Sequence, residues 1–152
     1  MNVPLAALAA LTVSALAAVL PVTAAAAAPA PVPAAAVAAS GNFHTPDNAV
    51  ACHWITYRPI SAALAASVKI HCERLADKTF VTLQTNGTIT TSHSGTAVAR
   101  GTASHGNGWL HRYTAKTVCI AELIYGKPGV TCTRSGNGSF AISAGGLNVH
   151  PG

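Results

Sequence analysis

The chain has 152 residues, enough for one domain of ordinary size and not comfortably for two. Charged residues make up 9% of it and hydrophobic residues 50%, and nine Lys and Arg against four Asp and Glu give a formal net charge of +5. This composition excludes a large enzyme, a multi-pass membrane protein and a disordered polyelectrolyte. The average hides two segments, because residues 1–40 contain 18 alanines and no charged side chain.

The N-terminal segment has the pattern of an export signal. An uncharged run of Ala, Leu and Val covers residues 3–20, and small residues follow it. An apolar run that leads into Ala-x-Ala sites is typical of a cleaved secretory signal peptide, which we place at residues 1–27. An uncleaved anchor is the alternative, because the run approaches the length of a membrane span. We expect no span after cleavage, since alanine contributes weakly to insertion and Pro4 and Pro21 bracket the run.

Residues 28–40 have the composition of a spacer. Prolines at positions 29, 31 and 33 alternate with small residues, which favours an extended backbone without internal hydrogen bonds. We therefore expect an Ala/Pro-rich linker here and a secreted domain at residues 41–152, which hold every glycine, cysteine and charge. A domain of this size has a marginal core, and crosslinks help to stabilise it.

The four cysteines of this domain predict two disulfide bonds, because disulfides form and persist in exported proteins. They are Cys52, Cys72, Cys119 and Cys132. Four cysteines allow three connectivities, and the spacing alone does not select one. No C-x-x-C motif and no closely spaced His pair is present, so we expect neither a metal site nor another cofactor.

Strand register selects the pairing. If residues 49–57 and 66–74 are antiparallel strands with Cys52 opposite Cys72, Trp54 faces Ile70 on one mostly apolar face. A shift of one residue in the pairing would turn the polar side chains of the opposite face, His53 and His71 among them, toward the core. The pattern therefore favours the pair Cys52–Cys72. The pair Cys119–Cys132 then remains to pin a hairpin.

Two further expectations follow from this pairing. In the second hairpin, Pro128-Gly129 has the composition of a tight turn. In the first, the register places His53 opposite His71 on the other face of the sheet. Two imidazoles this close disfavour each other's protonation, which predicts a pH-sensitive pair.

The rest of the domain consists of short β runs broken by glycine-rich turns. Asn86-Gly87 is the strongest short hairpin signal. One short helix is predicted at residues 59–67, where proline suits the first turn. The predicted fold is mainly β, a small disulfide-stabilised sandwich or barrel with at most one short helix. The further predicted strands are residues 79–85, 88–91, 96–99, 109–114, 117–123, 130–133, 140–143 and 147–149.

The segments around the cysteines resemble a known family. Residues 43–52, FHTPDNAVAC, resemble the opening motif of a family of small secreted actinobacterial proteins of unknown function. Cys72-Glu73 resembles the segment at the second cysteine of that family. Residues 129–132, GVTC, resemble its Gly-Val-Thr-Cys motif, and residues 136–143, GNGSFAIS, resemble its closing motif. The resemblance covers the two ends of the segment 43–149, and the middle of that segment has no matching motif. It implies secretion and a disulfide-linked β domain, with no assigned activity and no catalytic residues.

The surplus of basic residues favours an anionic partner. These residues are scattered, without a run and without the interleaved aromatic residues that stack nucleic-acid bases, so no specific nucleic acid is expected. We expect a non-catalytic binding or envelope-associated module, secreted or held at the cell envelope. Its partner would be an anionic cell-envelope polymer or a secreted protein.

A small secreted hydrolase of the nuclease type is the alternative function. Its candidate catalytic residues are His105, His111 and Lys116, which lie near Trp109 in the sequence and would supply acid–base chemistry and charge stabilisation. The chain has few carboxylates to orient these histidines, and no nucleophile–base–orienter pattern is visible.

Overall fold

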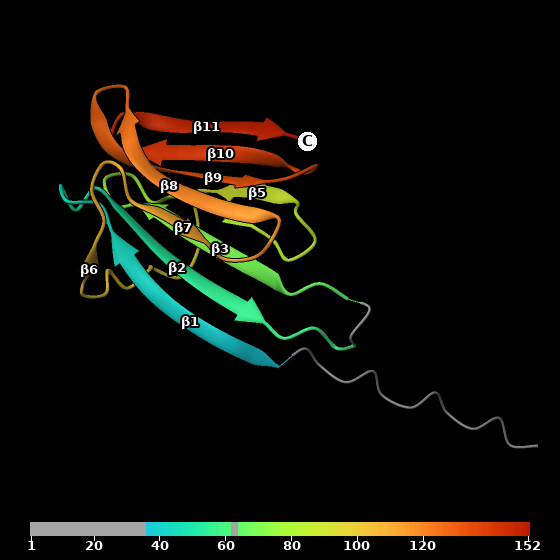
Figure 1. The fold of residues 1–152 in the computed structure, drawn as a ribbon. Coiled ribbons are helices and arrows are strands. Elements are labelled where there is room, and N and C mark those ends of the chain that lie inside the picture. Colours follow the sequence, from blue (N-terminus) through green and yellow to red (C-terminus); the bar gives the residue numbers. More distant parts are fainter. Residues whose placement is uncertain (1–35, 62–63) are drawn as a thin grey trace, which may run out of the picture. The chain divides into compact units, whose positions relative to one another are not determined.

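The computed structural model of the chain describes residues 36–61 and 64–152. The predicted signal peptide at 1–27 and residues 28–35 of the predicted linker lie outside the described residues. The described part forms eleven strands in two sheets and contains no helix (Figure 1). The predicted mainly β, disulfide-stabilised fold is confirmed, in the form of a two-sheet sandwich. Within the residues that the structure describes, no helix has the length and apolarity needed to cross a membrane.

The first sheet has six strands in the order β5-β4-β3-β2-β1-β6. Its neighbouring strands are antiparallel except for the short parallel pair β1–β6. The strands are β1 (Val37–His44), β2 (Val50–Tyr57), β3 (Ser67–Arg74), β4 (Thr79–Leu83), β5 (Ile89–Ser92) and β6 (Ala103–Ser104).

The second sheet has five antiparallel strands in the order β11-β10-β9-β8-β7. Figure 1 shows it as a second layer over the first sheet. The strands are β7 (Leu110–Arg112), β8 (Thr117–Ile124), β9 (Lys127–Arg134), β10 (Gly138–Ser143) and β11 (Gly146–Pro151).

Each sheet contains one disulfide, and both predicted pairs are confirmed. Cys52–Cys72 joins β2 to β3, and Cys119–Cys132 joins β8 to β9. All four cysteines are fully buried in one core between the sheets. The other fully buried members of this core alternate along their strands with outward-facing residues, which is the period-2 pattern of packed sheets. They include Phe43, Val50, Val68, Ile70, Val81, Leu83, Val130, Phe140 and Ile142.

The predicted register of the first hairpin is also confirmed. Cys52 pairs with Cys72, and Trp54 pairs with Ile70 on the inner face. His53 pairs with His71 on the outer face.

Two predicted elements are absent from the described residues. The helix predicted at 59–67 is wrong: its described residues form bends and coil, and β3 begins at Ser67. A helix of this length is marginal unless it buries an apolar face, and here Ile60 and Leu64 are both more than half exposed. The strand predicted at 96–99 is also wrong, because this segment pairs with no strand and lies against the outer face of the first sheet.

Two strands lie where the sequence pattern predicted none. β1 takes in residues 37–40, which overlap the predicted linker. β6 has only two residues and pairs with Phe43 and His44 of β1.

The turn between β8 and β9 differs from its prediction. Tyr125 and Gly126 form it, with φ angles of 54° and 71°, as a two-residue hairpin turn requires. Pro128 and Gly129 lie inside β9, where they pair with Leu123 and Glu122. The Asn86-Gly87 hairpin is confirmed, with Gly87 at a φ of 94°.

Candidate ligand-binding site

An aromatic cleft of about 240 Å³ lies between the β1 side of the first sheet and β7 at the edge of the second. It combines residues of β1, β2, β6 and the segment around β7. We call this cavity the aromatic cleft, and its lining residues are Gly41, Asn42, Phe43, Trp54, Ala103, His105, Trp109, His111 and Tyr113.

The alternation of side chains along β7 builds one wall of the aromatic cleft. Trp109, His111 and Tyr113 are two residues apart, so they lie on the same face of the strand. Leu110 and Arg112 lie between them on the opposite face and are exposed. Backbone hydrogen bonds fix both ends of this segment on β8: the Ala121 amide donates to the Trp109 carbonyl, and the Tyr113 amide donates to the Thr117 carbonyl.

The aromatic rings of this wall form a continuous row. The ring of His105 stacks on Trp109, with a centroid distance of 4.0 Å and an interplanar angle of 7°. Trp109 is followed by His111 at 5.8 Å and 11°. His111 contacts Tyr113 at 4.4 Å, and Tyr113 contacts Trp54 at 5.2 Å. Such contacts hold the rings in place and contribute about 0.5–1.5 kcal/mol each beyond simple burial.

The first sheet supplies the other wall. Phe43 is 1% exposed and lies 5.1 Å from Trp109 and 5.2 Å from His105, centroid to centroid. Trp54 crosses over β1 at Gly41, where a Cβ atom would come within 3.0 Å of the indole. Glycine at this position therefore allows the indole of Trp54 to line the cleft.

The aromatic cleft is lined by uncharged and imidazole side chains, without Lys, Arg, Asp or Glu. Burial lowers the pKa of His105, and the nearby His111 and His44 lower it further. Burial raises the pKa of Tyr113, whose hydroxyl is buried and has no hydrogen-bond partner among the described residues. At neutral pH the cleft therefore favours an uncharged ligand surface.

The three predicted catalytic candidates do not converge. His105 and His111 both line the aromatic cleft beside Trp109. Lys116 lies in another cavity, with Arg134. Sequence analysis missed Trp54, Phe43 and Tyr113 as members of the site, although the alternation of residues 109, 111 and 113 was a visible signal.

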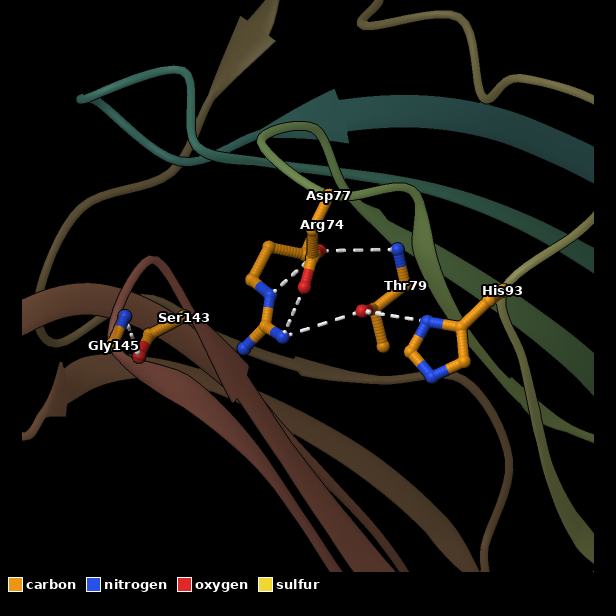
Figure 2. Close-up of polar contacts among 6 residues, drawn as sticks. All are labelled: Arg74, Asp77, Thr79, His93, Ser143 and Gly145. Atoms are coloured by element: carbon orange, nitrogen blue, oxygen red, sulfur yellow. Dashed lines mark hydrogen bonds and ion pairs between the residues drawn. The ribbon is translucent and has the colours of Figure 1, made fainter.

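The acidic residues are engaged elsewhere in structural contacts. Glu73 is fully buried and pairs with Lys78 at 2.8 Å. Asp47 accepts a hydrogen bond from the Thr45 hydroxyl at 2.7 Å, and Glu122 accepts one from Thr131. The fourth carboxylate, Asp77, belongs to the network of Figure 2.

Figure 2 shows that network at the turn between β3 and β4. Arg74 donates two hydrogen bonds to Asp77, at 2.9 and 2.6 Å, and a third to the Thr79 hydroxyl at 3.2 Å. The hydrogen bond with Arg74 holds the pKa of Asp77 well below its usual range. His93 approaches only Thr79, at 3.4 Å, so the carboxylate does not orient this histidine. The arrangement stabilises a turn and lacks a base–orienter pair.

The predicted histidine pair lies on the outer face of the first sheet. His53 Nδ1 is hydrogen bonded with Asn42 Oδ1, and His71 Nδ1 lies 2.6 Å from Thr82 Oγ1. Segment 96–99 and both histidines line an open cavity of about 360 Å³. Burial, and then the charge of Lys69, lower the pKa of His71. In the described part of the chain, no group of three or more His, Cys, Asp or Glu side chains is arranged to hold a metal ion.

No protein-family model matches the chain, and neither a curated protein nor a solved structure is similar to it.

Proposed function

We propose that this chain is a secreted, non-catalytic binding module whose aromatic cleft binds the sugar rings of a cell-envelope glycan. The observation that carries the proposal is the continuous row from His105 through Trp109, His111 and Tyr113 to Trp54. These rings come from both sheets, and the sandwich core holds them in place.

The chemistry of the row favours a sugar ring. The faces of a pyranose carry C–H groups, and the face of an aromatic ring carries the negative part of its quadrupole, so the two stack. His105 and His111 add a few polar groups at the cleft, which is the usual composition of a small-molecule site.

A nucleic-acid base would also stack on such a row. Proteins that bind single strands combine stacking with a positively charged groove that follows the phosphates. No Lys or Arg lines the aromatic cleft. This difference favours a glycan over a nucleic acid at this site.

The hydrolase alternative lacks support from the geometry of the aromatic cleft. The predicted alternative is a nuclease-type hydrolase, in which His105 and His111 supply acid–base chemistry and Lys116 stabilises charge, but Lys116 lines a different cavity. His105 and His111 also lack a carboxylate that would orient them, so the geometry supports binding.

Secretion rests on the expected signal peptide and on the two disulfides. Both bridges are buried, and disulfides persist mainly outside the cytosol. The resemblance to secreted actinobacterial proteins points to the same compartment.

The test is co-sedimentation of the mature domain with purified cell-wall glycan, together with titration of a soluble N-acetylglucosamine oligomer by tryptophan fluorescence. We expect Trp109→Ala to weaken binding roughly 10-fold or more, because one stacked ring contributes about 1–3 kcal/mol to binding of nucleic-acid bases and we take a similar value here. His111→Ala serves as a second variant because His111 is exposed and its loss perturbs the core less.

Tyr125→Ala is the matched control, since Tyr125 is 67% exposed and lies outside the cleft. Equal binding by the parent, Trp109→Ala and His111→Ala would contradict the proposal. Cleavage of RNA or single-stranded DNA by the parent domain, lost in His105→Ala, would favour the nuclease-type hydrolase.

A further inference from the structure

A second cavity, of about 400 Å³, is lined by residues at the starts of β3 and β8 and at the end of β9. These three strand ends lie at the same end of the sandwich (Figure 1). The polar lining of the cavity consists of Arg134 at the end of β9, Lys116 and Thr114 from the turn before β8, Ser67 at the start of β3 and Thr85 in the turn between β4 and β5. Alanines complete the wall. We call it the basic cavity.

The pairing of β8 with β9 brings the two cations together. Arg134 pairs with Thr117, the residue after Lys116, and the Ser135 amide donates a hydrogen bond of 2.9 Å to the Lys116 carbonyl. Arg134 lies on the inner face of its strand, two residues after the buried Cys132. It is half-buried, and its side chain passes over the turn glycine Gly87.

No carboxylate neutralises this pair. The ion pairs of the described residues are Arg74–Asp77 and Lys78–Glu73, and both lie outside the cavity lining. Lys116 is next to Thr117, the cross-strand partner of Arg134, so two positive charges line one cavity without a carboxylate in its lining. Lys116 and Arg134 therefore form a site that a bound anion would stabilise.

One side chain of the basic cavity also carries a buried atom without a hydrogen-bond partner. Within the described part of the chain, the buried side-chain atoms without a hydrogen-bond partner are Tyr113 Oη, Thr117 Oγ1 and Arg134 Nε. Thr117 is fully buried and pairs with Arg134, and the Tyr113 amide donates a hydrogen bond of 3.0 Å to the Thr117 carbonyl. Of these three atoms, Arg134 Nε is the one whose side chain lines the basic cavity. A buried polar group left unpaired costs about 1–3 kcal/mol, so a ligand in this cavity that accepts a hydrogen bond from Arg134 would remove that cost.

The hydroxyls around the basic cavity add donors. Thr114 Oγ1 already accepts hydrogen bonds from the amides of Lys116 and Thr117, at 3.2 and 3.0 Å. Its own hydrogen therefore remains to be donated to a ligand. Ser67 of β3 and Thr85 of the turn between β4 and β5 also line the cavity.

We propose that the basic cavity binds a phosphate group, as a free ion or monoester or as a phosphodiester in a polymer. An Arg guanidinium binds two phosphate oxygens in parallel, and a Lys ammonium adds a point charge. The hydroxyls of Ser67, Thr85 and Thr114, together with the two cations, offer more hydrogen-bond donors than the two oxygens of a carboxylate can accept. The additional oxygens of a tetrahedral phosphate can accept the remaining hydrogen bonds. The site does not depend on the ligand of the aromatic cleft. However, Thr114 directly follows Tyr113, so a phosphate-bearing glycan would meet both sites.

The test is titration of the mature domain with inorganic phosphate. Binding is monitored through the NMR chemical shifts of the backbone amides of Thr114, Lys116 and Ser135. We expect saturable shifts at these amides and affinity at least 10-fold lower in Arg134→Gln and in Lys116→Gln. Lys116 is exposed, so the second variant should leave the fold intact. Lys127→Gln, an exposed cation outside the cavity, is the matched control and should bind as the parent does.

Dimethyl phosphate separates the two sources of the ligand. Binding of both compounds supports a phosphodiester polymer, and binding of inorganic phosphate alone supports a free ion or monoester. Non-saturable shifts, equal loss in Lys127→Gln, or acetate binding as tight as phosphate would each overturn the proposal. Trp109→Ala should leave phosphate binding unchanged, so failure of the glycan proposal is distinguishable from failure of this one.

Discussion

The carboxylate of Glu73 accepts a hydrogen bond of 2.6 Å from the backbone amide of Val98, 25 residues further along the chain. Its other oxygen accepts one from Lys78 Nζ at 2.8 Å. Glu73 is fully buried and Lys78 is largely exposed, so the carboxylate is covered by the segment it binds. This contact fixes segment 96–99 over the outer face of the first sheet, beside His71.

Replacing Glu73 should release that segment. Glu73→Ala leaves the Val98 amide without its acceptor, and we expect a loss of about 1–3 kcal/mol in the free energy of unfolding. Hydrogen exchange of the Val98 amide should accelerate more than that of residues in β8. Lys78→Gln is the control, because it keeps the Val98 bond and should cost less in a urea titration. Unchanged exchange at Val98 in Glu73→Ala would contradict this account.

Acid should weaken the same contact. Burial alone raises the pKa of Glu73, but hydrogen bonds from Lys78 and Val98 more than offset it, and the pKa lies below its ordinary value of 4.5. The group therefore stabilises the fold above pH 4.5, and this stability is lost as the pH falls through the folded-state pKa. Unfolding free energies measured from pH 6 to pH 3 should fall less steeply in Glu73→Gln than in the parent.

The pKa of His71 predicts a second pH dependence, at milder acidity. Burial is the largest cause that lowers it from 6.5, the charge of Lys69 is next, and His53 contributes least. A folded pKa below the unfolded value means that stability is complete above pH 6.5 and is lost as the pH falls toward the folded value. His71→Gln should flatten the dependence of the unfolding free energy on pH between 7 and 5. His105, whose pKa is also lowered, supplies a residual slope.

Single variants separate the causes at His71. Lys69→Gln should reduce the slope, because it removes a charge that disfavours the protonated ring. His53→Gln should change it little, although His53 is the cross-strand partner of His71. A larger effect from His53→Gln than from Lys69→Gln would show that the neighbouring His53 ring, and not the charge of Lys69, is the main charged influence on the titration of His71.

The sequence was informative where one face of a strand is apolar. Alternation around Cys52 and Cys72 determined the register, including His53 opposite His71, because a slip of one residue exchanges the two faces. It was uninformative for residues 37–40, whose small side chains carry no such pattern, and for β6, which has two residues. Segment 96–99 has a strand-like composition, but its contacts are to Glu73 and the outer face, and only the folded chain brings these together.

The candidate site was predicted in part for the same reason. His105, His111 and Trp109 are close in sequence, so local reasoning grouped them. Phe43 and Trp54 join them from the other sheet, which requires the packing of β1 and β2 against β7.

Reduction of the two disulfides should lower stability strongly. Each bridge closes a loop, with sequence separations of 20 and 13 residues, and each should contribute about 2–4 kcal/mol by restricting the unfolded chain. We expect non-reducing peptide mapping of the protein to yield Cys52–Cys72 and Cys119–Cys132 peptides. A Cys52–Cys119 or Cys52–Cys132 peptide would contradict the register. Thermal unfolding with and without reductant should show a lower midpoint in the reduced domain.

Gly129 gives the sharpest test of the β8–β9–β10 packing. It lies in β9 between Glu122 and Ser143, and an added Cβ would come within 2.5 Å of Ile124 Cδ1 and 2.7 Å of the Ile142 carbonyl oxygen. The carbonyl belongs to a paired strand and cannot move away freely, so Gly129→Ala should destabilise the domain by about 1–3 kcal/mol through overpacking. Gly146→Ala is the matched control in β11, where the nearest atom would lie 3.7 Å away and the backbone φ is ordinary. Urea titration of both variants should show a clear loss for position 129 and a change within about 0.5 kcal/mol for position 146. Equal stability of the two variants would mean that β9 and β10 lie farther apart than the structure shows.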